Sequence, residues 1–213
     1  MSESRLPSVR GDELRPAVFL DRDGVLVANV FYADSNLWEA PRTPDRCGVY
    51  PWVPEALRML RDAGYALIVI SNQPNLALGK STRAELDHTH QVLVHTLEKQ
   101  GIDLTASYYC YHHPRAQDAS MRICVCRKPS PQMVRDAASA HGIDLSSSWM
   151  IGDRDTDIEC GCRAGVRTIR VSPDHSADKE AEVARFPPDL RAKNLLAAAQ
   201  LILNVPPADD EGR

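Results

Sequence analysis

Long apolar runs are missing from this sequence. No stretch of its 213 residues reaches the roughly 18–20 consecutive apolar residues that a transmembrane helix needs. The segment from Met1 to Arg15 has no apolar core of the kind that marks a secretory signal peptide. These absences exclude a membrane-spanning helix, and we expect a cytoplasmic protein with no membrane partner.

Aromatic residues and surplus positive charge are also scarce. With only three Trp, six Tyr and three Phe, the core must be built mainly from aliphatic side chains. The formal net charge of −4 gives no general attraction to nucleic acid, so we expect no nucleic-acid partner. An anionic ligand would therefore have to be held by a local group of basic side chains and backbone N–H donors.

Short apolar runs alternate with helix-period segments along most of the chain. This alternation predicts one α/β domain with a Rossmann-like, doubly wound parallel sheet over residues 17–204, after a loose segment 1–16 and before a tail 205–213. Ser81 is the expected N-cap of the second helix. The expected strands cover 17–21, 65–70, 107–110, 149–152 and 166–171, and the expected helices 53–64, 84–101, 130–142, 157–164 and 195–203.

Three polar side chains stand at the ends of three expected strands. Asp21, Ser71 and Asp153 each come at or directly after such an end, where ligands bind in open parallel sheets. The Asp21-Arg22-Asp23-Gly24 segment adds a second carboxylate, and carboxylates are the ligands that Mg²⁺ prefers. Each feature alone has an ordinary explanation, such as an acidic turn or a helix cap, but their convergence indicates one site. Lys128 would add the positive charge that stabilises a phosphoryl group.

Four segments together resemble a known family. FLDRDGVL, ISNQ, CRKPSP and IGDRDTD are similar, in this order, to the four motifs of the haloacid dehalogenase superfamily. The resemblance implies that Asp21 is a nucleophile that forms an aspartyl-phosphate and that Asp23 acts as acid and then base. Ser71 and Lys128, with Asn72 beside them, would hold the phosphate.

The same resemblance implies the metal ligands. Asp21, the backbone carbonyl of Asp23, and Asp153 would bind Mg²⁺. Asp157 would orient Lys128 or the metal shell, whereas Asp155 receives no role.

A loop rich in cysteine and histidine lies between the second and third of these motifs. Cys110, His112 or His113, Cys124 and Cys126 provide three thiolates and one imidazole, which is typical of a closed structural Zn²⁺ site. His112 is preferred because the spacing resembles the zinc loop of one subgroup, which contains heptose-bisphosphate and histidinol-phosphate phosphatases. Cys160 and Cys162 would point apart on a helix, so we expect them to be packing residues.

The sequence offers several candidate substrates. The spaces between the motifs leave no room for a separate cap domain, so selectivity would come from Asn29–Trp38, the zinc loop and Arg127. Tyr32 and the long spacer in the loop resemble heptose-bisphosphate enzymes, and we favour such a sugar phosphate. IGDRDTDI is closer to histidinol-phosphate enzymes, while Pro74-Asn75 and Leu78 depart from the heptose pattern. A non-catalytic phosphate-binding module is the third alternative. In each case the partner is a small phosphorylated metabolite, and the chain is a monomer or a weak homo-oligomer.

Overall fold

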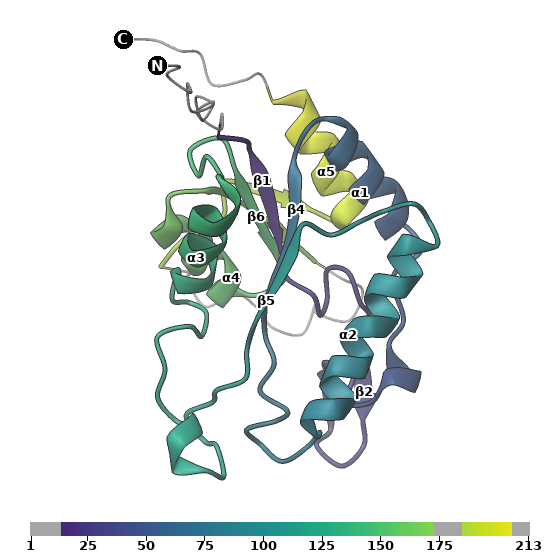
Figure 1. The fold of residues 1–213 in the computed structure, drawn as a ribbon, viewed down its shortest axis with the longest axis vertical. Coiled ribbons are helices and arrows are strands. Elements are labelled where there is room, and N and C mark those ends of the chain that lie inside the picture. Colours follow the sequence, from purple (N-terminus) through teal and green to yellow (C-terminus); the bar gives the residue numbers. More distant parts are fainter. Residues whose placement is uncertain (1–13, 173–184, 206–213) are drawn as a thin grey trace, which may run out of the picture.

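A parallel six-stranded sheet forms the centre of the protein (Figure 1). The structure, a computed structural model, describes residues 14–172 and 185–205. The strands lie in the order β5-β4-β1-β6-β7-β8, and each neighbouring pair is parallel. Their bounds are Ala17–Leu20 (β1), Ala66–Asn72 (β4), Ala106–Cys110 (β5), Trp149–Gly152 (β6), Arg167–Val171 (β7) and Leu190–Ala192 (β8). The predicted α/β class and doubly wound sheet are confirmed.

Helices cover both faces of this sheet, as Figure 1 shows. One face packs against α1 (Val53–Asp62), α2 (Arg83–Glu98) and α5 (Leu195–Asn204), and the other against α3 (Gln132–His141) and α4 (Asp155–Ala164). Short 3₁₀ turns occur at Pro44–Arg46 (η1) and Ala119–Met121 (η2). Within the described residues, no helix is both long enough and apolar enough to span a bilayer.

The central strand β1 is apolar throughout because both of its faces are covered. Val18 and Leu20 point into the core under α1 and α5, whereas Ala17 and Phe19 point into the core under α3 and α4. The strand pairs with β4 on one side and β6 on the other. The residue that follows β1 therefore emerges at the middle of the sheet's carboxyl edge.

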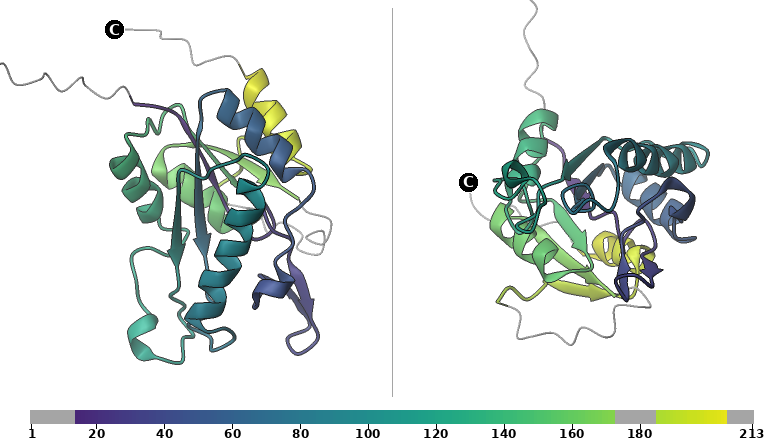
Figure 2. Two further views of the ribbon diagram at one scale, coloured as in Figure 1. Left: turned by 45° about the vertical axis from the view of Figure 1, so that its right-hand side comes forward. Right: turned by 90° about the horizontal axis from the view of Figure 1, so that it is seen from below.

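A small antiparallel hairpin and a long loop project beyond that edge (Figure 2). The hairpin consists of β2 (Val30–Tyr32) and β3 (Leu37–Glu39). Glu39 fastens it to the loop after β4 through a 2.6 Å ion pair with Lys80. The long loop runs from the end of β5 through η2 to α3. Within residues 14–172 and 185–205, these two segments stand beside the carboxyl ends of the strands, and no separate cap domain covers them.

Several local predictions differ from the structure. The prediction that Ser81 caps α2 is wrong: Thr82 is the N-cap and forms a capping box with Glu85, because a Thr followed three residues later by Glu satisfies two backbone donors. Ser81 instead donates its hydroxyl to the Arg42 carbonyl oxygen, 2.8 Å away. The hairpin and β8 were not predicted, and α4 begins two residues early, at Asp155.

The predicted terminal segments lie mostly outside the described residues. Leu14, Arg15 and Pro16, from the end of the segment expected to be loose, are described, and Arg15 forms a parallel bridge with Ile143. Of the expected tail 205–213, only Val205 is described.

Candidate active site

Asp21 lies directly after β1 at the carboxyl edge of the sheet. Its backbone N–H donates to the Ile151 carbonyl oxygen at 2.9 Å, so the pairing of β1 with β6 continues to this residue. The chain then turns sharply: Gly24 donates to the Val27 carbonyl oxygen, and Leu26 and Val27 donate to that of Arg22. This turn holds Asp21 and Asp23 in a buried position near the ends of three strands.

Lys128 is the buried cation of the site. Its Nζ donates to Asp21 Oδ1 at 2.8 Å and to the Ile70 carbonyl oxygen at 2.7 Å, and it lies 2.6 Å from Asp157 Oδ1. Burial alone would lower the pKa of Lys128, but the charges of Asp157 and Asp21 outweigh it and raise that pKa. The ammonium is therefore held in its charged form beside the Asp21 carboxylate.

Asp21 remains ionised for a matching reason. Burial would raise the pKa of its carboxyl, but the charge of Lys128 and hydrogen bonds from Lys128 and Ser71 outweigh burial and lower that pKa. An unprotonated carboxylate at a strand end, next to a fixed cation, has the properties that a nucleophile toward phosphorus requires. The structure thus brings together three residues that the sequence assigned to phosphoryl chemistry.

Asp153 completes an acidic cluster with Asp21 and Asp157. Each of the three offers a carboxylate oxygen, and these oxygens lie within 4.8 Å of one another. Burial, together with the charges of Asp21 and Asp157, raises the pKa of Asp153 to about 8. Its Oδ1 is buried without a hydrogen-bond partner among the described residues. A hard divalent cation would satisfy this oxygen and reverse the unfavourable clustering of charge, so the residues fit Mg²⁺.

Asp157 has a supporting position within this cluster. Its Oδ1 faces Lys128, and its Oδ2 accepts from the Arg154 backbone N–H at 3.0 Å. Both oxygens of Asp157 are thus engaged, whereas Asp153 Oδ1 accepts no hydrogen bond from the described residues and has the Arg154 Nε 4.0 Å away. This contrast favours Asp153 as a metal ligand and Asp157 as the residue that orients Lys128.

Asp23 faces a different set of partners. Arg22 donates to both of its carboxylate oxygens, from Nε at 3.0 Å and from Nη2 at 3.2 Å, and Gln73 Nε2 donates to Oδ2 at 2.6 Å. Sequence reasoning gave no role to Arg22 or Gln73. The available signals were their positions, since Arg22 stands between the two acids and Gln73 ends the ISNQ segment.

The cysteine and histidine side chains of the long loop also converge. Cys110 Sγ lies 3.7 Å from Cys124 Sγ, 3.1 Å from Cys126 Sγ and 3.7 Å from His112 Nδ1. A tetrahedral site with Zn–S bonds of about 2.3 Å separates its sulfur ligands by about 3.8 Å, so the four donors are close to the spacing that Zn²⁺ requires. His112, rather than His113, belongs to this group, and His113 Nδ1 accepts from the Arg115 backbone.

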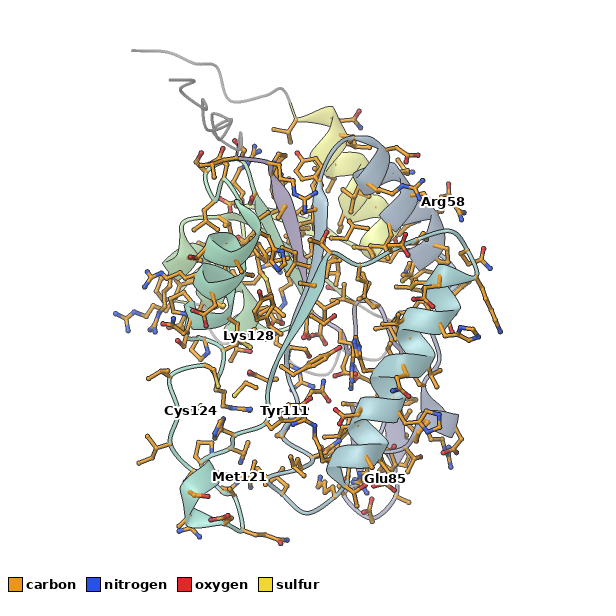
Figure 3. The ribbon with its side chains drawn as sticks, in the orientation of Figure 1. Arg58, Glu85, Tyr111, Met121, Cys124 and Lys128 are labelled. Carbon is orange, nitrogen blue, oxygen red and sulfur yellow. The ribbon has the colours of Figure 1, made fainter. Side chains whose placement is uncertain are left out.

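The cysteine and histidine cluster is linked to the acidic site by the chain itself, because Cys126 precedes Lys128 by two residues; Figure 3 labels Cys124 and Lys128 on this segment. Arg127, between Cys126 and Lys128, donates from Nη1 to the His112 carbonyl oxygen at 3.0 Å. The Asn72 side chain accepts from the Lys128 backbone N–H at 3.0 Å and donates to its carbonyl oxygen at 3.1 Å. Asn72 thus fixes the segment that carries Lys128.

The remaining residues singled out by the sequence contact partners outside the acidic cluster. Tyr32 is on the hairpin, where its hydroxyl accepts from the Arg42 backbone N–H at 2.8 Å and its ring lies under the Arg42 guanidinium. Asp155 pairs with Arg170. Cys160 is buried in the core under α3 and α4, which confirms its packing role, and Cys162 is half-buried.

Comparison with known proteins finds relatives of this chain over most of its length. The model of the HAD-hydrolase-like family matches residues 125–198. The D-glycero-beta-D-manno-heptose-1,7-bisphosphate 7-phosphatase of Salmonella typhi is 34% identical over 169 residues, which cover 78% of this chain and 86% of that protein. The D-glycero-alpha-D-manno-heptose-1,7-bisphosphate 7-phosphatase of Photorhabdus laumondii is 32% identical over 186 residues, covering 86% of this chain and 94% of that protein.

A solved structure resembles the whole fold. The D,D-heptose 1,7-bisphosphate phosphatase of B. bronchiseptica, complexed with magnesium and phosphate, superposes with a TM-score of 0.72 at 27% identity. The match covers 88% of this chain and 98% of that one. A protein of this fold therefore holds the metal and the anion for which the acidic cluster and Lys128 are suited.

Proposed function

Because the chain belongs to the haloacid dehalogenase-like phosphatases, we propose that it hydrolyses a sugar phosphate through an aspartyl-phosphate on Asp21. The preferred substrate is D-glycero-D-manno-heptose 1,7-bisphosphate, the compound named for both sequence relatives and for the B. bronchiseptica structure. The observation that carries the mechanism is the ionised Asp21 carboxylate, which lies 2.8 Å from the buried Lys128 ammonium and clusters with Asp153, whose Oδ1 accepts no hydrogen bond from the described residues.

In the first half-reaction, Asp21 attacks phosphorus. Lys128 and Ser71 stabilise the negative charge on the phosphoryl oxygens as the bond to the leaving oxygen breaks. Asp23 gives a proton to that oxygen, so the sugar leaves as an alcohol and the phosphoryl group remains on Asp21. In the second half-reaction, Asp23 takes a proton from water, which attacks phosphorus and releases phosphate and the free Asp21 carboxylate.

Two metals fit the chain in separate places. Asp21, Asp153 and the backbone carbonyl of Asp23 would hold Mg²⁺, which, when bound, neutralises the repulsion between carboxylate and phosphate and aligns the two. Cys110, His112, Cys124 and Cys126 would hold a structural Zn²⁺. With four protein ligands this second site has no open position, so its role is to fix the loop that carries Arg127. Such reduced thiols favour a cytoplasmic location.

Substrate selectivity is assigned to the segments that stand beside the acidic site. Arg127 is immobilised against His112 and next to Lys128, where a guanidinium would bind a second phosphate or sugar hydroxyls by paired hydrogen bonds. Tyr32, on the hairpin, is the other proposed substrate contact. We propose that the protein acts as a monomer, with a small phosphorylated metabolite as its partner.

The direct test is phosphate release from a defined panel with Mg²⁺ present. The panel contains both anomers of the heptose bisphosphate, histidinol phosphate and a nucleoside monophosphate. We expect one heptose bisphosphate to have the highest kcat/KM. A preference for histidinol phosphate over both anomers would overturn the substrate assignment and leave the aspartyl-phosphate mechanism in place.

A further inference from the structure

A closed ring of hydrogen bonds encloses the Asp23 carboxylate. Arg22 donates from Nε to Oδ1 at 3.0 Å and from Nη2 to Oδ2 at 3.2 Å. The same Nη2 donates to Gln73 Oε1 at 2.7 Å, and Gln73 Nε2 returns a hydrogen bond to Asp23 Oδ2 at 2.6 Å. Each of the three side chains therefore contacts both of the others, and all are buried.

The orientation of the Gln73 amide follows from the chemistry of its neighbours. A guanidinium can only donate, so the oxygen of Gln73 must face Arg22, and this orientation places its nitrogen against Asp23. The nitrogen also donates to Ser71 Oγ at 3.2 Å, which leaves the Ser71 proton free to point toward Asp21. One amide thus connects Asp23 with the hydroxyl that serves the phosphoryl group.

The local backbone explains how adjacent residues can form this ion pair. On a regular strand, Arg22 and Asp23 would point to opposite faces. The turn that follows β1 removes this restriction, because the Arg22 carbonyl accepts from Leu26 and Val27 and Asp23 bridges to Val27.

A half-buried aromatic ring supports the guanidinium. The Arg22 guanidinium carbon lies 5.7 Å from the centroid of the Tyr109 ring, and the Tyr109 hydroxyl is 2.8 Å from His90 Nδ1. The side chain of Arg22 is 1% exposed. An arginine buried to this degree, beside the catalytic turn and paired mainly with one carboxylate, calls for a functional reason.

We infer that Arg22 and Gln73 are positioning residues that fix the direction of the Asp23 carboxylate and, through it, the proton transfer to the leaving group. This inference rests on the proposed function, in which Asp23 is the acid and base. Arg22 fixes the direction in which both carboxylate oxygens point, and Gln73 sets the rotation of the carboxylate plane relative to Ser71. Proton transfer depends steeply on such alignment.

The consequence is a selective dependence on the leaving group. Phenolate is a strong base and needs a proton as it departs, whereas p-nitrophenolate is a weak base and leaves without one. Loss of alignment should therefore slow phosphoryl transfer from phenyl phosphate much more than from p-nitrophenyl phosphate. A merely structural loss would slow both substrates by the same factor.

Two conservative variants of the Mg²⁺-loaded protein test this inference. Arg22→Lys keeps the charge but loses the fork that reaches both Asp23 and Gln73, and Gln73→Glu keeps the shape but places an acceptor against Asp23. We expect each to lower kcat/KM for phenyl phosphate about tenfold to a hundredfold more than for p-nitrophenyl phosphate. Arg167→Lys is the matched control, because that guanidinium also packs on a ring, Trp149, but at the opposite end of the strands.

A double-mutant cycle with Asp23→Asn separates the inference from the proposed function. If Arg22 and Gln73 act through Asp23, then adding Arg22→Lys or Gln73→Glu to Asp23→Asn should not change the ratio of kcat/KM for the two substrates. Suppose that Asp23→Asn slows phenyl phosphate more than p-nitrophenyl phosphate, but Arg22→Lys and Gln73→Glu slow both equally. This result would overturn the inference and leave the proposed function in place. An unchanged ratio in Asp23→Asn itself would remove the acid role of Asp23 and the inference with it. Should Arg22→Lys fail to fold, as judged by circular dichroism, Gln73→Glu decides the question.

Discussion

Gly24 lies against Asp153 so closely that a Cβ on Gly24 would be 2.5 Å from Asp153 Oδ2. The glycine also has φ +89°, a conformation that other residues rarely adopt. The turn after β1 and the acid after β6 are therefore in direct contact, and a side chain at position 24 would displace the predicted Mg²⁺ ligand.

We expect Gly24→Ala to raise the Mg²⁺ concentration for half-maximal activity by about tenfold or more, because the methyl group moves Asp153. Gly64→Ala is the matched control: Gly64 has φ +90°, but no atom lies within 4 Å of its added Cβ. The control should lose about 1 kcal/mol of stability and keep its Mg²⁺ dependence. Equal Mg²⁺ dependence in the two variants would contradict the role of the contact.

Asp21→Asn should fold normally and lose turnover by several orders of magnitude, since an amide of similar size cannot form the acyl phosphate. The measurement is kcat with p-nitrophenyl phosphate, accompanied by thermal unfolding. Asp155→Asn is the control, because Asp155 is another acid of the IGDRDTD segment and pairs with Arg170. Its kcat should stay close to that of the wild type. Substantial activity in Asp21→Asn would show that another residue attacks phosphorus.

The roles of Mg²⁺ and Zn²⁺ can be distinguished by how readily each ion is removed. Brief EDTA treatment and desalting should abolish activity that Mg²⁺ alone restores, because an oxygen shell exchanges readily. Zinc bound by three thiolates should survive this step at about one ion per chain, measured by elemental analysis. Cys124→Ser should lower the zinc content and destabilise the loop, whereas Cys47→Ser, outside the cluster, should not change the zinc content. Protein that contains no zinc after expression with ample supply would refute the loop assignment.

Arg127→Ala should lower kcat/KM for the heptose bisphosphate about tenfold to a hundredfold, the loss expected when a charge-assisted contact is removed. Hydrolysis of p-nitrophenyl phosphate should fall much less, because this substrate has no second phosphate or sugar. Arg122→Ala is the control within the same loop, since Arg122 donates to the Ala116 and Gln117 carbonyl oxygens. Equal losses on both substrates in Arg127→Ala would place Arg127 at the reaction centre.

The sheet and the acidic centre were predictable because their signals are local and strong. The segment Ala17–Leu20 is apolar on both faces, as expected of a central strand that helices cover on both sides. The acid that follows this strand must therefore lie at the carboxyl edge of the sheet. Asp153 follows β6 in the same way. Parallel pairing then brings Asp21 and Asp153 together without further information.

The other features depend on contacts between segments that the sequence pattern does not encode. The hairpin strands have three residues each, and their Phe31, Leu37 and Trp38 are exposed, so no apolar alternation marks them. Strand β8 is equally short and becomes a strand only by pairing with β7.

The Arg22–Asp23 pair was hidden for a different reason. A strand pattern places neighbouring residues on opposite faces, and only the turn geometry brings these two together. Thr82 is a contrasting case, because its capping signal, Thr followed three residues later by Glu, was present in the sequence and was assigned one residue too early.

The central claim is that the phosphoryl group passes through Asp21, and trapping it there is the most direct measurement. Asp23→Asn protein should be mixed with ³²P-labelled p-nitrophenyl phosphate, quenched in acid and digested. The good leaving group needs no acid, but the missing base slows hydrolysis, so the intermediate should accumulate. We predict that the label approaches one phosphoryl group per chain, lies on the peptide that contains Asp21 and is released by hydroxylamine. The double variant that carries Asp21→Asn together with Asp23→Asn should contain no label. Label on another residue, or p-nitrophenolate release with no labelled protein at any time point, would contradict the account.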